Sequence, residues 1–247
     1  MHEDNHTLIL PHICAVLPCP PSKEVVCIGG GRAPARDWLA ALIRLHEADG
    51  VMRPVWAIDR GVNICHALAL SPSHLIGDGD SADASAWEWA KIQGAEVHVF
   101  PPEKDFTDTE LALHIAAQND PCSLIILTAA FGGRLDHLMS TAAVVANASI
   151  PCVLADERET LFYLHEGESL TVTCKNPPCA ISLLPFTEEC LGVTTAGLYW
   201  ELTDARITNH AALTVSNVLA HDNTQKIFTV SLRSGILGVY LCHKEQQ

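Results

Sequence analysis

Aspartates in the first 140 residues form three clusters, and each cluster follows a run of apolar residues that predicts a buried strand. The clusters are Asp78-Gly-Asp-Ser81, Asp105-Phe-Thr-Asp108 and Gly132-Gly-Arg-Leu-Asp-His137. Ligands of an open parallel sheet bind beyond the carboxyl ends of its strands, so we expect these clusters to meet there. Carboxylates gathered in one place repel one another unless a cation lies between them. Hard oxygen ligands suit Mg²⁺, and a nearby arginine with flanking glycines suits a nucleotide polyphosphate.

The candidate metal ligands are three carboxylates, which would bind the cation directly or through water: Asp78, Asp80 and Asp108. Asp80 or Asp108 is also a candidate general base for a hydroxyl nucleophile, because a carboxylate within hydrogen-bond reach can accept its proton.

The Gly132–His137 segment supplies groups that suit phosphate. Arg134 can donate a bidentate pair of hydrogen bonds to phosphate oxygens, and Gly132 and Gly133 permit close backbone approach. Asp136 either completes the metal ligand set or complements the dipole of the helix that it opens, and we favour the first.

Other polar residues near these clusters have two readings each. Asp59 lies at a predicted strand end, where it faces nucleotide or substrate or shapes a turn. Thr107 donates to a phosphate or bonds a local backbone group. Asp105 is a ligand or begins a helix, and Ser81 touches ligand or caps a turn. His137 opens a helix, so we expect a structural role.

Elements that would position these residues follow a βα rhythm from residue 23 to 155, which predicts an α/β domain built on a parallel sheet. The predicted strands are Val25–Ile28, Val55–Asp59, His74–Gly77, Ala95–Phe100 and Ser123–Thr128. The predicted helices are Arg36–Glu47, Ala84–Gly94, Thr109–Gln118 and Leu135–Asn147. The first 22 residues read as a lead-in with little role in chemistry.

Residues 156–247 contain short β-rich runs separated by turn residues, which predicts a small all-β sandwich domain. The predicted strands are Leu161–His165, Ser169–Cys174, Ala180–Pro185, Gly197–Leu202, Lys226–Leu232 and Ile236–Cys242.

Composition narrows the class of protein. Hydrophobic residues make up 48% of the chain and the net charge is −14, so we expect a globular protein that binds neither nucleic acid nor an anionic membrane. No segment approaches the length of a membrane span, and the N-terminus does not resemble a signal peptide. Ten cysteines without a CxxC pair indicate reduced thiols in a cytoplasmic protein.

The three clusters, in this order and spacing, resemble the motifs of the thiamine pyrophosphokinase family. Ala57-Ile-Asp-Arg-Gly-Val-Asn63 resembles an earlier segment of that family, and its C-terminal signatures resemble Val193-Thr-Thr-Ala-Gly-Leu-Tyr-Trp-Glu-Leu202 and Ser216-Asn217. The resemblance covers roughly residues 25–242. It implies an α/β catalytic domain, a β-sandwich domain, homodimers with sites near the subunit interface, and the reaction ATP + thiamine → thiamine diphosphate + AMP. One departure is Gly79, where the family usually carries an aromatic residue.

The resemblance directs attention to Trp200, Ser216 and Asn217 as thiamine-binding residues. The cationic thiazolium and flat aminopyrimidine of thiamine suit the face of a tryptophan. Ser216 and Asn217 can hydrogen-bond the pyrimidine, although such a pair is also common in turns. Two alternatives remain open at this stage: a metal-dependent glycosyltransferase with an Asp-x-Asp motif, and a non-catalytic sensor of thiamine or nucleotide.

Overall fold

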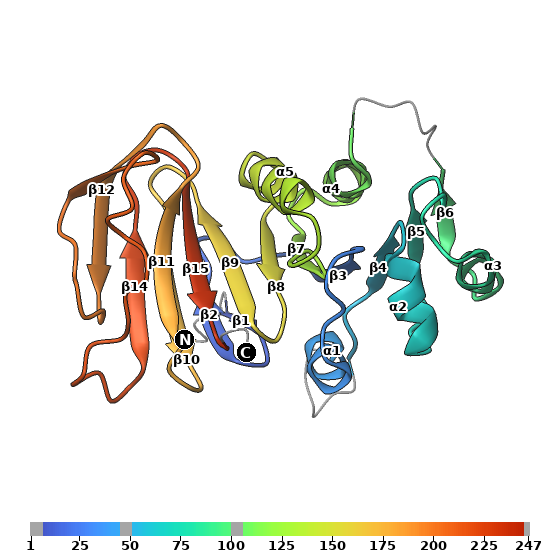
Figure 1. The fold of residues 1–247 in the computed structure, drawn as a ribbon, viewed down its shortest axis with the longest axis horizontal. Coiled ribbons are helices and arrows are strands. Elements are labelled where there is room, and N and C mark those ends of the chain that lie inside the picture. The colour runs from blue at the N-terminus through green and yellow to red at the C-terminus, as the bar shows by residue number, and fades with distance from the viewer. Residues whose placement is uncertain (1–6, 45–50, 100–105, 245–247) are drawn as a thin grey trace. The chain divides into compact units, whose positions relative to one another are not determined.

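The computed structural model describes residues 7–44, 51–99 and 106–244. The chain forms two compact units, which we name the α/β unit (residues 21–156) and the β unit (residues 1–20 with 157–247). Figure 1 shows the elements of each unit.

The α/β unit is built on a parallel sheet with strand order β8-β7-β3-β4-β5-β6. Apolar side chains bury the central strands on both faces, as all five residues of β7 illustrate. The strands are β3 (Glu24–Ile28), β4 (Val55–Ile58), β5 (His74–Ile76), β6 (Glu96–His98), β7 (Leu124–Thr128) and β8 (Cys152–Ala155). The order of strand addition reverses at β3, between β4 and β7, and such a reversal creates a crevice at the carboxyl ends.

Helices lie on both sides of this sheet (Figure 1). They are α1 (Arg36–Ile43), α2 (Gly61–Ala67), α3 (Ala84–Ile92), α4 (Asp108–Asn119) and α5 (Leu135–Ala146). The α/β prediction is confirmed, whereas the short helix α2 was not predicted. The C-terminal end of the predicted helix Arg36–Glu47 and the end of the predicted strand at Phe100 lie outside the described residues.

The β unit consists of antiparallel strands in two groups, ordered β1-β2-β10-β14-β12-β13 and β11-β15-β9. Alternating burial along β10 (Ser169–Cys174) sends Leu170 and Val172 into the core. The other strands are β9 (Glu159–Leu164), β11 (Ala180–Pro185), β12 (Glu189–Ala196), β13 (Ala205–Thr208), β14 (Ile227–Ser231) and β15 (Leu237–Cys242). The prediction of an all-β second part is confirmed.

The predicted strand Gly197–Leu202 is wrong. Strand β12 ends at Ala196, and Gly197 turns the chain with a φ of +82°. A Cβ on Gly197 would stand 2.3 Å from the Ile227 carbonyl oxygen, so the backbone approaches its neighbour too closely for a side chain. The following segment, including Trp200, is therefore a loop and not a strand.

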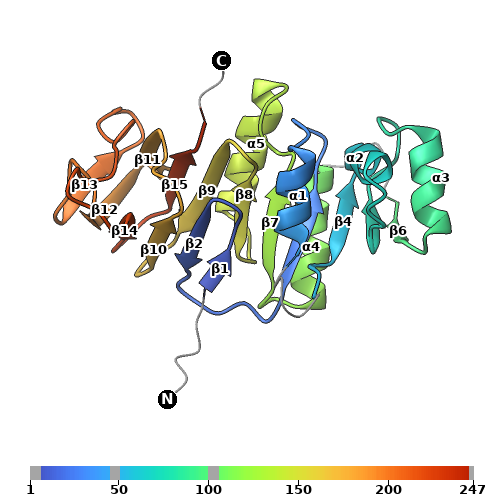
Figure 2. The same cartoon turned by 90° about the horizontal axis from the view of Figure 1, so that it is seen from below.

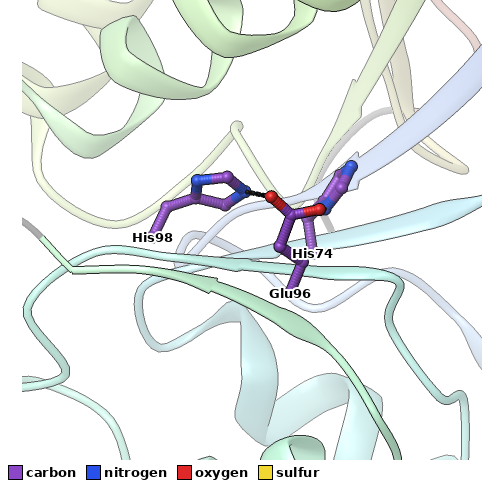
Figure 3. Close-up of side chains that lie close together, drawn as sticks. All are labelled: His74, Glu96 and His98. Carbon is purple, nitrogen blue, oxygen red and sulfur yellow. Dashed lines mark ion pairs between the residues drawn. The ribbon is translucent and has the colours of Figure 1, made fainter.

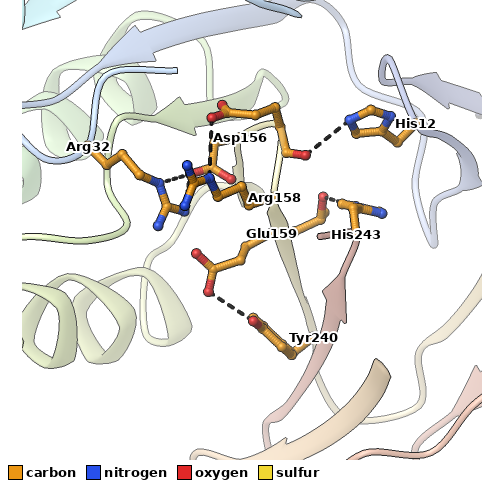
Figure 4. Close-up of polar contacts among 9 residues, drawn as sticks. His12, Arg32, Asp156, Arg158, Glu159, Tyr240 and His243 are labelled. Carbon is orange, nitrogen blue, oxygen red and sulfur yellow. Dashed lines mark hydrogen bonds and ion pairs between the residues drawn. The ribbon is translucent and has the colours of Figure 1, made fainter. Parts of the chain in front are cut away.

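The N-terminal lead-in contributes β1 (Thr7–Ile9) and β2 (Ile13–Val16), and β2 pairs with β10 (Figure 2). His12 Nε2 lies 3.1 Å from the Glu157 carbonyl oxygen (Figure 4). The His12 ring lies 5.0 Å from that of His243, whose pKa falls to about 4, mainly through burial. The lead-in is thus part of the β unit, a role that its sequence did not reveal.

No helix within the described ranges is both long and apolar enough to cross a membrane.

Candidate active site

Three carboxylates converge beyond the carboxyl ends of neighbouring strands in the α/β unit. Asp59 follows β4, while Asp78 and Asp80 follow β5. Parallel pairing places these strand ends side by side, and the Asp59 N–H donates to the Ile76 carbonyl at 2.7 Å. One ligand oxygen from each of the three carboxylates lies within 4.8 Å of the others. We name this group, together with the nearby Asp108, the acidic cluster.

Asp59 is the most constrained member of the acidic cluster. Its φ of +49° is in the left-handed region, which a non-glycine residue rarely adopts. Its Oδ2 accepts a hydrogen bond from the Ser81 hydroxyl, whereas its Oδ1 is buried without a hydrogen-bond partner in the part of the chain that the structure describes. A buried carboxylate oxygen without a donor is costly unless a cation contacts it. Asp59 was predicted to face nucleotide or substrate, or to shape a turn, and not to bind metal, so its place beside Asp78 and Asp80 is new.

The carboxylates of Asp78 and Asp80 repel each other within the Gly77–Ser81 loop. The Asp80 N–H donates to Asp78 Oδ1 at 3.1 Å, which turns the backbone and brings the two carboxylates together. The pKa of Asp80 is raised, first by its hydrogen bond with the Asp78 side chain and by the charge of Asp78, then by lesser effects that include the charges of Asp59 and Asp108. A group of oxygens that disfavours its own ionisation fits a hard divalent cation.

Asp108 approaches the acidic cluster from the first turn of α4. Its Oδ1 lies 3.4 Å from the position that a Cβ on Gly77 would occupy. Thr107 caps this helix, because its Oγ1 accepts a hydrogen bond from the Glu110 N–H at 3.2 Å. The Thr107 hydroxyl hydrogen can still donate to a phosphate, so that predicted role stays a prediction. Asp105 lies outside the described residues.

Gly79 departs from the family pattern, and the structure gives the departure a context. Its φ is +75°, and a Cβ there would stand 3.1 Å from the Trp87 ring. Trp87 on α3 therefore packs against this loop at Gly79. The family usually carries an aromatic residue at the position of Gly79 itself. The positive φ and the close Trp87 ring favour a glycine at position 79.

The loop after β7 carries the predicted phosphate-binding residues. Gly132 and Gly133 both have positive φ values, 74° and 72°. Arg134 is largely exposed and donates from Nε to Asp136 Oδ1 at 3.1 Å and from a terminal nitrogen to Oδ2 at 2.5 Å. This pairing lowers the pKa of Asp136. The structure thus places Asp136 with Arg134, and Asp136 does not belong to the group of converging metal-competent carboxylates among the described residues.

Two further arginines lie near the strand ends and were not predicted as site residues. Arg60 donates from Nε to the Gly30 carbonyl at 2.5 Å. Arg32 pairs with the fully buried Asp156, with 3.1 Å between Nε and Oδ2 (Figure 4). The Arg32 N–H donates to the Phe131 carbonyl at 2.7 Å and so joins the loops after β3 and β7. In the sequence, Arg60 belongs to the Ala57–Asn63 motif, but no motif pointed to Arg32.

Trp200 in the β unit is 61% exposed, so it is not a core residue. Its ring makes an edge contact with Tyr199 at a centroid distance of 4.7 Å. A small pocket of about 70 Å³ adjoins it, lined by Leu183, Trp200, Leu202, Leu213, Thr214, Val215 and Asn217. An exposed indole beside a pocket suits stacking on a flat ligand.

Asn217 fixes the backbone of Trp200. Its Oδ1 accepts from the Trp200 N–H at 3.2 Å, and its Nδ2 donates to the Trp200 carbonyl at 2.8 Å. Ser216 has a φ of +64°, and its N–H donates to the Ser182 hydroxyl at 3.0 Å. Asn217 therefore positions the Trp200 loop, and direct contact of Ser216 or Asn217 with a pyrimidine stays a prediction.

His137 and Ser81, the two remaining predicted residues, both make polar contacts. His137 is exposed, and its N–H donates to Asp136 Oδ1 at 3.0 Å. Ser81 donates to Asp59 and so supports the acidic cluster. Neither contact would be visible in the sequence, because the partners are set by the fold or by side-chain rotamers.

Comparison with known families matches both parts of the chain. Residues 52–154 match the family described as "Thiamin pyrophosphokinase, catalytic domain", and residues 170–237 match "Thiamin pyrophosphokinase, vitamin B1 binding domain". The first match spans the acidic cluster and Arg134, and the second spans Trp200 and Asn217.

Individual relatives agree with these matches. The chain is 28% identical to a thiamine pyrophosphokinase of Bacillus subtilis over 183 residues, which cover 73% of this chain and 83% of the relative. It is 25% identical to thiamine pyrophosphokinase 1 of rice, Oryza sativa subsp. japonica, over 225 residues, 85% of this chain and 79% of the relative.

Solved structures show the same fold. A Bacillus subtilis thiamine pyrophosphokinase structure has a TM-score of 0.75 at 22% identity, and the match covers 90% of this chain and all of that one. A Geobacillus thermodenitrificans structure of the same name has a TM-score of 0.70 at 27% identity, with 90% and 99% covered. With both of the family's domains matched in order, the chain belongs to the thiamin pyrophosphokinase family.

Proposed function

We propose that the acidic cluster holds the Mg²⁺ of a bound ATP while this enzyme transfers the pyrophosphoryl group of ATP to thiamine. The products are thiamine diphosphate and AMP. Family membership supports the activity, and one observation supports the place. The carboxylates of Asp59, Asp78 and Asp80 converge, and Asp59 Oδ1 is buried with no hydrogen bond from any described residue.

The metal would be held by Asp78 and Asp80, as predicted, with Asp108 reaching it directly or through water and Asp59 added by the geometry. Bound Mg²⁺ neutralises polyphosphate charge and polarises the reacting phosphorus. Four carboxylates without a cation would repel the same polyphosphate, so the chain's own charges make ATP binding depend on the metal.

The chemical step joins the thiamine hydroxyl oxygen to the β-phosphorus of ATP and breaks the bond from that phosphorus to the α-phosphate oxygen. The electron pair leaves with AMP, and the hydroxyl proton passes to a carboxylate. Asp80 suits this role because it lies in the loop that would hold the metal, where a carboxylate can come within hydrogen-bond reach of the hydroxyl. Asp108 is the second candidate.

Phosphate oxygens would be bound by the loop after β7 and the start of α4. Arg134 offers a planar pair of donors, although these now contact Asp136, so a phosphate would share or replace that carboxylate. Gly132 and Gly133 leave room for close approach, and Thr107 offers a hydroxyl. Asp136 then serves to orient Arg134 and not to bind metal.

Thiamine would stack on the exposed face of Trp200, whose loop Asn217 and Ser216 hold in place. Thiamine carries a permanent positive charge, and a cation over an indole face is stabilised by about 0.5–2 kcal/mol. The acidic surface of the chain, with a net charge of −14, also favours a cationic substrate.

The active protein would be a homodimer in which Trp200 of one chain completes the site whose acidic cluster lies in the other. The family resemblance supports this arrangement. Mixing inactive Asp80→Asn chains with impaired Trp200→Ala chains should then restore activity, because one of the two sites in a mixed dimer is intact. Verified mixed dimers with no more activity than their parents would instead favour sites within one chain.

The cellular location follows as a proposal from the cysteines, all ten of which are free in the structure. Free thiols persist in a reducing compartment such as the cytoplasm.

The activity is tested with purified protein, thiamine, Mg²⁺ and ATP labelled at either the α- or the γ-phosphorus. Pyrophosphoryl transfer places the α-label in AMP and the γ-label in thiamine diphosphate, in equal amounts. Label from the γ-position in thiamine monophosphate would indicate a simple kinase. Ligand binding without turnover would favour the sensor alternative.

A further inference from the structure

Two histidines and a glutamate gather on one face of the edge strand β6 and its neighbour β5. Their ligand types differ from those of the acidic cluster. Glu96 and His98 are two residues apart on β6, so their side chains point to the same face. His74 on β5 pairs with Glu96 in the strand register. Figure 3 shows both imidazole rings directed toward the Glu96 carboxylate, which lies between them.

The contacts within this group have the distances of ion pairs and are not hydrogen bonds. His74 Nδ1 lies 3.6 Å from Glu96 Oε2, and His98 Nε2 lies 3.4 Å from Glu96 Oε1. Both nitrogens are buried and have no hydrogen-bond partner among the described residues. Buried ring nitrogens without a partner are uncommon, so something beyond the protein's own donors and acceptors is missing here.

We propose that His74 Nδ1, His98 Nε2 and the Glu96 carboxylate bind one divalent transition-metal cation of the zinc class. Ligands about 2.0–2.1 Å from a tetrahedral zinc ion lie about 3.3–3.4 Å from one another, close to the nitrogen–oxygen distances in this group. All three ligand atoms already lie within 4.8 Å of one another, so small side-chain rotations complete the set.

The ligand types separate this site from the acidic cluster. Imidazole nitrogens select zinc, cobalt, nickel or copper over magnesium, whereas an all-oxygen group selects magnesium. Burial lowers the pKa of His74, although Glu96 partly opposes this, and so favours the neutral imidazole that a metal needs. The Glu96 side chain is 66% exposed, so the fourth position faces solvent and would take water.

Trp56 preorganises one ligand. Its ring meets that of His74 edge-on at a centroid distance of 4.1 Å, and the two residues pair across β4 and β5. A buried indole against the imidazole restricts the rotation of His74 and so reduces the entropy lost when the metal binds.

The metal would tie β5 to β6 close to the catalytic loops. The Gly77 N–H donates to the His98 carbonyl at 3.1 Å, and Gly77 begins the loop that carries Asp78 and Asp80. A cation bound across the two strands therefore stabilises the base of that loop.

Cobalt(II) titration of chelator-treated protein in excess Mg²⁺ tests the site, because tetrahedral Co²⁺ absorbs visible light and Mg²⁺ does not compete for imidazole. We expect one equivalent to bind the wild type. His98→Ala should lower the affinity at least about 100-fold and Glu96→Gln about 10-fold or more. Asp78→Asn, which alters only the acidic cluster, and His210→Ala, which removes an exposed histidine of the β unit, should bind as the wild type does.

Several outcomes would overturn the proposal. They are the absence of one tight equivalent in the wild type, equal binding by His98→Ala and Glu96→Gln, and a sulfur-to-cobalt charge-transfer band that indicates cysteine ligands. Glu96→Gln is nearly isosteric and exposed, so it decides the matter if His98→Ala does not fold.

Discussion

The acidic cluster of the α/β unit and the Trp200 loop of the β unit differ in how far their polar groups are satisfied within the protein. In the acidic cluster, like charges are crowded together, Asp59 Oδ1 has no hydrogen bond from any described residue, and the pKa of Asp80 is raised. In the Trp200 loop, Asn217 binds both backbone groups of Trp200, and the indole is left exposed. The first region is incomplete without a cation, whereas the second is satisfied internally and presents only a surface.

This difference separates two kinds of contribution to one reaction. Groups that stabilise developing charge must be held ready at some cost to the fold, because their charges are used only when the ligand arrives. A stacking surface carries no such cost, since an exposed ring has no unpaired polar group. Substitutions in the two regions should therefore differ in which kinetic constant they change and in the sign of their effect on stability.

The largest effect is expected from Asp78→Asn and Asp80→Asn. Each removes a charged metal ligand but keeps the size of the side chain, so kcat should fall at least about 100-fold while the circular dichroism spectrum stays unchanged. Steady-state rates across a Mg²⁺ titration measure this. Near-normal rates for both variants at limiting Mg²⁺ would remove the acidic cluster from catalysis.

Trp200→Ala should act on thiamine and not on ATP. Loss of a stacking surface worth about 2 kcal/mol raises the KM for thiamine roughly 30-fold and leaves the KM for ATP within about twofold. Trp200→Phe is the matched control and should recover most of the affinity. An equal rise in both KM values would show that Trp200 supports the fold and not the substrate.

Arg134→Lys keeps the charge but loses the planar pair of donors. We expect kcat/KM for ATP to fall about tenfold, the equivalent of one charge-assisted hydrogen bond. Asp136→Asn is the companion variant, because it frees Arg134 from its present partner. Unchanged kinetics of Arg134→Lys under subsaturating ATP would argue against a bidentate phosphate contact.

Asn217→Ala should loosen the Trp200 loop without removing the ring. The lost hydrogen bonds correspond to about 1 kcal/mol, so the KM for thiamine should rise about fivefold, less than for Trp200→Ala. If Asn217→Ala exceeds Trp200→Ala in its effect, Asn217 contacts thiamine directly.

The smallest effect concerns stability and has the opposite sign. The pKa of Asp80 is raised in the folded protein, so the ionised carboxylate destabilises the fold above that pKa, and stability is regained as the pH falls through it. Without divalent cations at pH 7, Asp80→Asn should melt slightly above wild type. The difference should shrink at acidic pH, and Mg²⁺ should raise the melting temperature of wild type more than that of the variant.

Local patterns in the sequence predicted most elements of the α/β unit, because apolar runs and the turn residues after them mark buried strands. The short helix α2 and strands β1, β2, β8, β12 and β13 were not predicted. Strand β2, for example, is defined by its pairing with β10, which lies far along the chain. The sequence pattern predicted a strand at Gly197–Leu202. Close backbone approach at Gly197 instead ends β12 at Ala196, just before this segment.

The site was only partly readable for the same reason. Asp78, Asp80 and Asp108 belong to recognisable motifs, but the place of Asp59 beside them depends on the pairing of β4 with β5. The link between Arg134 and Asp136 and the clamp of Asn217 on Trp200 depend on rotamers and loop shape, which the sequence does not specify. Glu96 and His98 are two residues apart on one strand and so share a face, which the sequence can indicate. Only the pairing of β5 with β6 brings His74 to them.

A crystal structure with Mn²⁺ and a non-hydrolysable ATP analogue would test the central claim most directly, because Mn²⁺ replaces Mg²⁺ at oxygen sites and gives an anomalous signal. We predict an anomalous peak between the carboxylates of Asp59, Asp78 and Asp80, in contact with the polyphosphate, and no such peak in Asp80→Asn crystals. A peak on the polyphosphate that lies away from these three carboxylates would contradict the account.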